Sequence, residues 1–228
     1  MNEFMVKPVA YIHTDFKEKF GIPRQSGRAP SLTAEIIFTT EYRNPDALRG
    51  IEKYSHLWII WQFSESILDS WHATVRPPRL GGNTSVGVFA SRSPMRPNPI
   101  GLSSVRLVDV IKSESDGTIL IVSGADMLNG TPIYDIKPYL SFTDSHPDAI
   151  DGFAGDVFER KLTVVDNGMF DDIEPKTAKI IKELLSQDPR PQYKSDPERV
   201  YGMAYGGYNV KFKVEGEWLY ITEVEGNG

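Results

Sequence analysis

The chain has 228 residues, of which 40% are hydrophobic and 25% are charged, and its formal net charge is −6. This composition is typical of a globular protein, and a chain of this length buries enough apolar surface to fold without disulfides or metal ions. Cysteine is absent, which excludes disulfides, thiolate zinc sites, iron–sulfur clusters and cysteine nucleophiles. The four histidines lack metal-ligand spacing, and no apolar run approaches the roughly 20 residues that cross a bilayer. We therefore expect neither a bound metal nor a membrane segment.

Positive charge is concentrated in the first half of the chain. Residues 1–106 carry a net charge of +4 and residues 107–228 a net charge of −10. The segment 70–108 contains five arginines and no acidic residue. Such a segment is suited to an anionic partner such as RNA, although a set of structural arginines would give the same pattern.

The first two-thirds of the chain have the sequence pattern of a β-protein. Runs rich in β-branched and aromatic residues recur roughly every 15 to 25 residues, with one short helix expected at 46–54. This spacing favours a single closed, mainly antiparallel β-barrel over repeated βαβ units. Strand 102–111 alternates imperfectly, as a bulge would cause. The predicted strands cover residues 34–38, 56–63, 85–90, 102–111, 118–123 and 157–165.

The C-terminal third predicts a small α+β unit. A helix is expected over 175–187, because acidic residues precede it, Pro175 suits its first turn and four aliphatic residues share one face. A β-hairpin is expected over 208–221. We therefore predict a domain of residues 1–145 and a second of residues 156–228, which is too small to be independent and docks on the first.

Residues 76–101 hold five prolines and four glycines. A proline-stiffened connection between strands would explain this composition. The alternative is a pair of stiff loops that present arginines at one end of a sheet, where guanidinium groups bind phosphate or carboxylate in a bidentate manner. The arginines in question are Arg76, Arg79, Arg92 and Arg96.

Residues 129–140 also permit two interpretations. In an extended segment, Asp135 and Lys137 would share one face with Ile133. The segment is then either an edge strand with a surface ion pair or a ligand-lining segment in which Asp135 faces a cation or an N–H donor.

Several common motifs are missing. The sequence contains no Gly-x-Gly-x-x-Gly after a strand, no Walker loop, no Gly-x-Ser-x-Gly elbow and no His-Glu-x-x-His. Residue patterns alone therefore indicate a mainly β protein, without a Rossmann unit, that has an arginine-lined pocket.

Six strings in the sequence resemble the TrmO family, whose members are also called TsaA-like, YaeB or VirR proteins. The resemblance runs from about Val6 to Leu140 and continues more weakly at Gln187–Tyr193. The Arg-Pro-Asn-Pro-Ile-Gly and Asp-Ile-Lys-Pro-Tyr strings are highly specific together. The strings are Pro23-Arg24-Gln25, Phe63-Ser64-Glu65, residues 74–82, residues 88–93, residues 96–101 and residues 135–139.

This resemblance implies a cytoplasmic, S-adenosylmethionine-dependent tRNA methyltransferase. Family members methylate N6 of N6-threonylcarbamoyladenosine at position 37, in the tRNA anticodon loop. They bind the cofactor in a single non-Rossmann β-barrel and form homodimers. Single-stranded loops expose their bases for stacking and their phosphates for basic side chains.

The family pattern also implies site residues. The expected cofactor contacts are Pro23, Arg24, Gln25, Ser64, Glu65, Arg92, Leu102, Gly130, Thr131, Pro132 and Ile133. Many relatives have His-Gln in place of Ser64-Glu65, so the contact there runs through either side chains or backbone. Asp135 is the expected proton acceptor or N–H-orienting group. The expected tRNA contacts are Arg76, Arg79, Arg96, Lys137, Arg190 and Tyr193.

Two other functions stay open at this stage. A binding module for S-adenosylmethionine or RNA would share the pocket without methyl transfer. A methyltransferase for a small molecule or a protein would not need a basic face outside the pocket.

Overall fold

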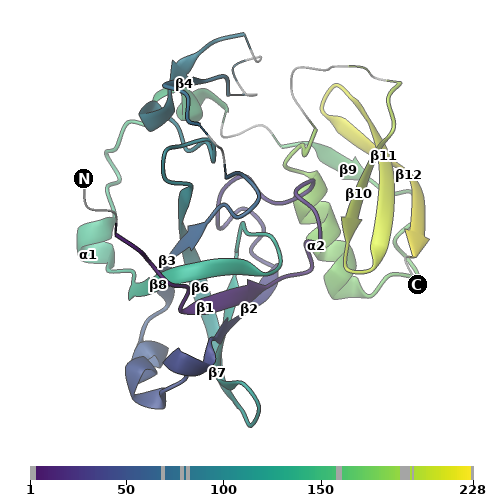
Figure 1. Ribbon diagram of the computed structural model, residues 1–228. Helices are drawn as coiled ribbons and strands as arrows, with labels where there is room; N and C mark the ends of the chain where they lie inside the picture. The colour runs from purple at the N-terminus through teal and green to yellow at the C-terminus, as the bar shows by residue number, and fades with distance from the viewer. Residues whose placement is uncertain are drawn as a thin grey trace.

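The structure, a computed structural model, describes residues 4–67, 70–77, 80, 83–157, 161–190, 196 and 198–226. Most of its regular elements are strands of two sheets (Figure 1). The larger sheet is built from the N-terminal part of the chain. The smaller sheet lies beside helix α2 (Pro175–Leu185) and is built from the C-terminal part. The prediction of a mainly β protein is confirmed.

The larger sheet contains six antiparallel strands in the order β1-β2-β7-β6-β3-β8. Strand β8 pairs with β1 as well as with β3, so the sheet closes on itself and each strand has two neighbours. Closure satisfies the backbone groups that an edge strand would expose. The strands are β1 (Ala10–His13), β2 (Thr33–Phe38), β3 (His56–Gln62), β6 (Ile100–Ser113), β7 (Gly117–Ser123) and β8 (Thr131–Pro138).

Alternating side chains fill the interior of this sheet. Leu57, Ile59 and Trp61 of β3 point inward and are at most 5% exposed. Trp58 and Ile60 face outward and are partly covered by neighbouring chain. Strand β3 therefore reads as a continuous apolar run in the sequence, although only one of its faces lines the core.

The irregular pairing expected in the strand at 102–111 is also present. The register of β6 against β7 shifts between Leu107 and Asp109. A bulge of this kind bends the strand. It lets β6 extend over 14 residues while it follows the curvature of the closed sheet.

Two predicted elements differ from the structure. Only Val86–Gly87 of the expected strand 85–90 is extended, as β5, and it pairs with β4 (Thr74–Val75). Residues Val88–Ala90 form a 3-10 turn instead, because the Ser91 hydroxyl donates to the Val88 carbonyl at 2.9 Å and curls the chain. The expected helix 46–54 is replaced by two 3-10 helices, Pro45–Leu48 and Ile51–Lys53.

The smaller sheet has the strand order β10-β11-β12-β9. Its hairpin, β11 (Tyr208–Glu215) and β12 (Trp218–Gly226), confirms the predicted one. Of the predicted strand 157–165, Thr163–Val165 is extended as β9, Val157 ends a 3-10 helix, and residues 158–160 lie outside the described residues. β10 (Tyr201–Tyr205) was not predicted. α2 begins where predicted, because the Glu174 carboxylate accepts hydrogen bonds from the backbone N–H groups of Lys176 and Thr177. The described residues include three further short helical segments: Thr40–Tyr42, α1 (Ser141–Asp144) and Gly152–Val157.

The loop of residues 14–32, between β1 and β2, packs against both parts of the chain. Its Phe16, Ala29 and Leu32 are buried in the core formed by α2 and the smaller sheet. The Glu183 carboxylate of α2 accepts hydrogen bonds from the Ser31 backbone N–H at 3.0 Å and from the Ser31 hydroxyl at 2.6 Å. We call this segment the β1–β2 loop. The loop is held at its two ends by β1 and β2, and its buried side chains are held by α2 and the smaller sheet.

Gly101→Ala tests how tightly the core of the larger sheet is packed. A Cβ at Gly101 would lie 2.2 Å from Cε2 of Trp61. We expect this substitution to lower the free energy of unfolding by about 1–3 kcal/mol, measured by urea denaturation. Gly87→Ala is the matched control, because its Cβ would meet no atom within 4 Å. Equal stability of the two variants would contradict the packing described here.

Candidate functional site

Six strand termini meet at one end of the larger sheet. β1, β3 and β7 end there, and β2, β6 and β8 begin there. The register pairs Gln62 with Ile100, Ile12 with Thr131, and Thr33 with Ser123. Segments far apart in the sequence are thereby brought together, which is where functional loops on a rigid scaffold commonly lie.

The expected cofactor residues gather around this end of the sheet. Pro23, Arg24 and Gln25 belong to the β1–β2 loop, and Ser64 and Glu65 directly follow β3. Arg92 precedes β6, and Leu102 lies near the start of β6. Residues 130–133 include the first residues of β8.

The clearest contact within this set joins Gln25 and Arg92. Nη1 of Arg92 donates a hydrogen bond to Oε1 of Gln25, across 67 positions of sequence. Nε2 of Gln25 donates to the Arg24 carbonyl at 2.6 Å. The contact orients an exposed guanidinium, a group that binds carboxylates and phosphates.

The turn after β3 is tied to the same region. Nζ of Lys19, in the β1–β2 loop, donates to the Glu65 carbonyl at 2.7 Å and lies 3.5 Å from its carboxylate. The Phe63 backbone N–H donates to the Pro99 carbonyl at 2.8 Å. Ser64 and Glu65 are both exposed, whereas the Ser64 N–H donates to the Gln62 carbonyl at 2.9 Å and the Glu65 carbonyl accepts from Lys19.

The expected contacts on β6 and β8 differ in accessibility. Leu102 is 59% exposed, and Gly130 adopts a φ of 76° with no atom near its hypothetical Cβ. Ile133 is fully buried in the core. Thr131 is also buried, and its hydroxyl donates to the Leu128 carbonyl at 2.7 Å. The open surface is therefore formed by Leu102 and the turn at Gly130.

Asp135 and Lys137 lie on the outer face of β8 and form an ion pair of 2.7 Å. The register pairs Asp135 and Ile133 with the consecutive residues Ile60 and Trp61, so Tyr134 is an extra residue of a bulge. Ile133 consequently faces the core, and the expectation that it shares a face with Asp135 was wrong. β8 is not an edge strand, since it pairs on both sides.

Asp135 also lies in register with the expected cofactor surface. Ile60 of β3 pairs with Leu102 on one side and with Asp135 on the other. The three residues form a row across the outer face of the sheet, with neighbouring strands about 4.8 Å apart. This row connects Leu102 to the Asp135–Lys137 pair.

The expected tRNA-binding residues have different surroundings. Arg76 is exposed, whereas Nη1 of Arg96 donates to the carbonyls of Ser91 (2.8 Å) and Ser93 (3.4 Å). Arg190 is mostly buried in a two-point ion pair with Asp188. Arg79 and Tyr193 lie outside the described residues.

Asp126 is a polar residue of this region that the sequence analysis missed. It follows β7, is partly buried, and its Oδ1 accepts a hydrogen bond from the Ser103 hydroxyl at 2.6 Å. Burial raises the pKa of Asp126 to about 6, while Ser103, Arg92 and the Ser26 backbone N–H act to lower it. Asp126 had one signal in the sequence: it is a carboxylate that follows a largely apolar strand.

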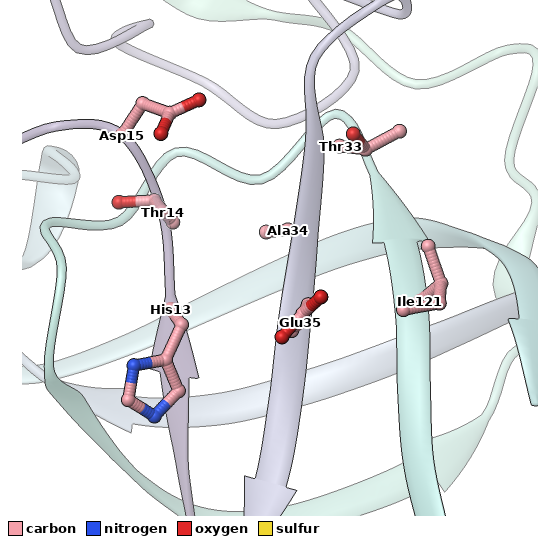
Figure 2. A pocket seen from close by; sticks show the side chains of 7 residues that line it. All are labelled: His13, Thr14, Asp15, Thr33, Ala34, Glu35 and Ile121. Atoms are coloured by element: carbon pink, nitrogen blue, oxygen red, sulfur yellow. The ribbon is translucent and has the colours of Figure 1, made fainter. Parts of the chain in front are cut away.

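A cavity of about 350 Å³ lies on the outer face of β1, β2 and β7. Figure 2 shows its lining side chains on these strands and on the start of the β1–β2 loop: His13, Thr14, Asp15, Thr33, Ala34, Glu35 and Ile121. None of the site residues expected from the sequence lines this cavity.

The described part of the chain contains no cluster of three or more His, Asp or Glu side chains that could hold a metal ion. None of its helices is long and apolar enough to cross a membrane.

Comparison with known proteins assigns the family. Residues 11–145 match the model of the tRNA-methyltransferase O N-terminal domain, and residues 166–227 match the model of the TrmO C-terminal domain. The tRNA (adenine(37)-N6)-methyltransferase of Escherichia coli is 40% identical over 223 residues, which cover 94% of each chain.

Two further comparisons support the same family assignment. A putative S-adenosylmethionine-dependent methyltransferase, RcsF of Pseudomonas aeruginosa, is 39% identical over 87% of each chain. A crystal structure of TrmO from Pseudomonas aeruginosa superimposes with a TM-score of 0.77 at 31% identity, and the match covers 99% of this chain and 100% of the other. The chain therefore belongs to the TrmO family.

Proposed function

We propose that the protein is an S-adenosylmethionine-dependent tRNA methyltransferase that methylates N6 of adenosine 37. The names of its relatives and its membership of the TrmO family support this activity. We further propose that the substrate base is N6-threonylcarbamoyladenosine in the anticodon stem-loop, as the resemblance in the sequence implies.

The observation that carries the proposal is the hydrogen bond between the Arg92 guanidinium and the Gln25 side chain. The contact joins two family motifs at the end of a closed sheet that lacks a Rossmann unit. An amide and a guanidinium held together suit the carboxylate of an amino-acid moiety, such as the one in S-adenosylmethionine. The open turn at Gly130 and the exposed Leu102 provide backbone and apolar surface beside them.

The residues at this site fit the cofactor. Bound S-adenosylmethionine would supply an electrophilic methyl group on a positively charged sulfur. The chain's own task is to hold the acceptor base in line with that group and to exclude water, which requires no covalent nucleophile. Gln25 and Arg92 would orient the cofactor, and Glu65 would offer a carboxylate to its positively charged sulfur.

We assign Asp135 the task of accepting or orienting the N6 proton of the base. It lies in one row with Ile60 and Leu102, so a base bound over this row would reach it. Lys137 neutralises the Asp135 carboxylate at 2.7 Å and has to move towards an RNA phosphate to free it. An Asp135→Asn variant that retained the wild-type kcat would remove this assignment.

The proposed tRNA surface is the segment 70–108, which contains five arginines and no acidic residue. Arg76 is exposed and free of acidic neighbours in the sequence, which suits contact with anticodon-loop phosphates. Arg96 shapes the loop that carries Arg92 through the carbonyls of Ser91 and Ser93. Arg79 and Tyr193 complete the proposed RNA contacts, and Arg190 joins them only if it leaves its ion pair with Asp188.

We also propose that the closed sheet is a cofactor-binding β-barrel domain of residues 1–145 and that residues 156–228 form a small C-terminal domain. The protein acts as a homodimer in the cytoplasm. The exposed apolar side chain of Phe89 supports a contact with a second copy, and the lack of cysteine suits a reducing compartment.

Methyl transfer to tRNA tests the activity directly. Purified protein is incubated with S-adenosylmethionine and with tRNA that carries or lacks the threonylcarbamoyl group, and the nucleosides are analysed by mass spectrometry. We expect a gain of one methyl group at position 37 in the threonylcarbamoylated tRNA alone. Cofactor binding without transfer would indicate a binding module, and equal transfer to a free nucleoside would exclude a tRNA-specific enzyme.

Arg92→Ala tests the cofactor site. Because the side chain is exposed and bonded to Gln25, its removal is expected to change the free energy of unfolding by less than about 0.5 kcal/mol. We expect affinity for S-adenosylmethionine, measured by calorimetry, to fall by at least about tenfold. Arg106→Ala, an exposed arginine of β6, is the matched control. A large loss of stability with unchanged affinity would make Arg92 a structural residue.

Arg76→Ala tests the tRNA surface. Each lost phosphate contact on a single-stranded loop lowers the slope of log affinity against log salt by about 0.7. We expect this decrease for Arg76→Ala, and a larger one when Arg79→Ala is added, with little change in cofactor affinity. Lys213→Ala, in the smaller sheet and paired with Glu198, is the control. An unchanged slope in the double variant would move the RNA surface elsewhere.

A further inference from the structure

Trp58 is held firmly on the outer face of the larger sheet. It points outward from β3 and is partly exposed, and neither hydrophobic core of the described residues includes it. Its Nε1 nevertheless donates to Oδ2 of Asp144, the last residue of α1, at 2.9 Å. Its ring lies beside that of Tyr139, with 5.5 Å between the centroids. The indole is therefore fixed in position without being buried in a core.

The Asp144 carboxylate ties the indole to the backbone that follows β8. The same Oδ2 accepts from the Leu140 backbone N–H at 2.8 Å. The Leu140 and Trp58 N–H groups hold the pKa of Asp144 below its usual range, so this carboxylate is ionised at neutral pH. Hydrogen bonds to an ionised acceptor are stronger than those between neutral groups. Asp144 therefore sets the direction of the Trp58 ring.

The register places Trp58 next to the residues assigned to the acceptor base. Trp58 pairs with Ser104 of β6 on one side and with Lys137 of β8 on the other. This row lies two residues along β3 from the row of Ile60, a distance of about 7 Å. The ring and the proposed base site thus occupy adjacent rows of one face of the sheet.

The surroundings of Trp58 suit a nucleobase better than a second protein. Tyr139 apart, its neighbours in its own row and in the row of His56 are polar: Ser104, Lys137, His56 and Arg106. A protein interface requires a wider apolar centre than one such ring provides. A base of single-stranded RNA stacks on a single aromatic ring, and basic side chains beside the ring attract its phosphates.

We propose that Trp58 is a stacking platform for a base of the single-stranded anticodon loop next to the methylated adenosine, and that Asp144 is the residue that positions its ring. This inference rests on the proposed function and deepens it. The acceptor base lies over the row of Ile60, its neighbour in the loop lies over Trp58, and Lys137 is adjacent to the phosphate between them.

Trp58→Leu removes the aromatic ring and keeps an apolar side chain. We expect the affinity for an anticodon stem-loop, measured by fluorescence anisotropy, to fall by about tenfold, with wild-type affinity for S-adenosylmethionine. The slope of log affinity against log salt stays unchanged, because stacking releases no counterions. Trp218→Leu, at a tryptophan of β12 that is 50% exposed, is the matched control and retains wild-type RNA affinity.

Asp144→Ala tests the positioning role in a double-mutant cycle. If Asp144 acts through the indole, its removal weakens stem-loop binding in the wild-type background and has no further effect in Trp58→Leu. A merely structural carboxylate would weaken binding equally in both backgrounds, which would remove the role assigned to Asp144. Trp58→Phe, which keeps a ring and loses the N–H, is expected to bind RNA more tightly than Trp58→Leu.

Photocrosslinking of the wild-type protein keeps the inference testable if Trp58→Leu does not fold. A stem-loop with a photoreactive thiouridine beside the acceptor adenosine is expected to crosslink to the peptide that contains Trp58, and crosslinks to other peptides alone would overturn the inference. Wild-type RNA affinity in Trp58→Leu would also overturn it, and a smaller oligomer in the same variant would assign this face to a second copy. Failure of the wild-type protein to bind the stem-loop would instead refute the proposed function itself.

Discussion

The β1–β2 loop is anchored in the core of α2 and the smaller sheet while it crosses the end of the larger sheet, and the site depends on this constraint. Phe16, Ala29 and Leu32 of the loop are buried with α2 and the smaller sheet, while both loop ends continue into strands of the larger sheet. The loop also crosses the end of β7 at backbone distance. The Gly27 N–H donates to the Gly124 carbonyl at 2.8 Å, and a Cβ at Gly124 would lie 2.9 Å from the Gly27 Cα atom. These anchors fix the backbone around Gln25 without regular secondary structure.

The C-terminal part of the chain therefore supports the site through packing and backbone contacts. Nη2 of Arg24 donates to the Arg190 carbonyl at 3.0 Å, and Nε2 of Gln187 donates to the Arg28 carbonyl at 3.0 Å. Asp188, next to this segment, adopts a left-handed φ of 52°, which is uncommon outside glycine, and its carboxylate holds the Arg190 guanidinium. The family-like string at Gln187–Tyr193 thus includes residues that buttress the β1–β2 loop.

Sequence patterns identified the elements that follow strong local rules and missed those set by tertiary contacts. β3 and the hairpin of β11 and β12 were predictable from apolar runs and a turn. β10 has the sequence Tyr-Gly-Met-Ala-Tyr, which lacks β-branched residues, and it is extended because it pairs with β11. In the site, family motifs nominated Gln25 and Arg92 separately, but their contact is a property of the fold. Asp126 was missed because burial, which gives it an unusual pKa, is not visible in a local sequence window.

The location of the site is also related to the lack of a free helix N-terminus for anion binding in the described residues. Helix N-termini commonly bind phosphate and carboxylate groups through free backbone N–H groups. In the described residues the one α-helix longer than four residues is α2, and the Glu174 carboxylate already accepts from its first free N–H groups. This helix end therefore carries a negative charge and repels anions. Binding of an anionic group then depends on side chains and on loop backbone, and the segment 70–108 supplies arginines without acidic neighbours. A guanidinium needs a partner that fixes its direction, and Gln25 is that partner for Arg92.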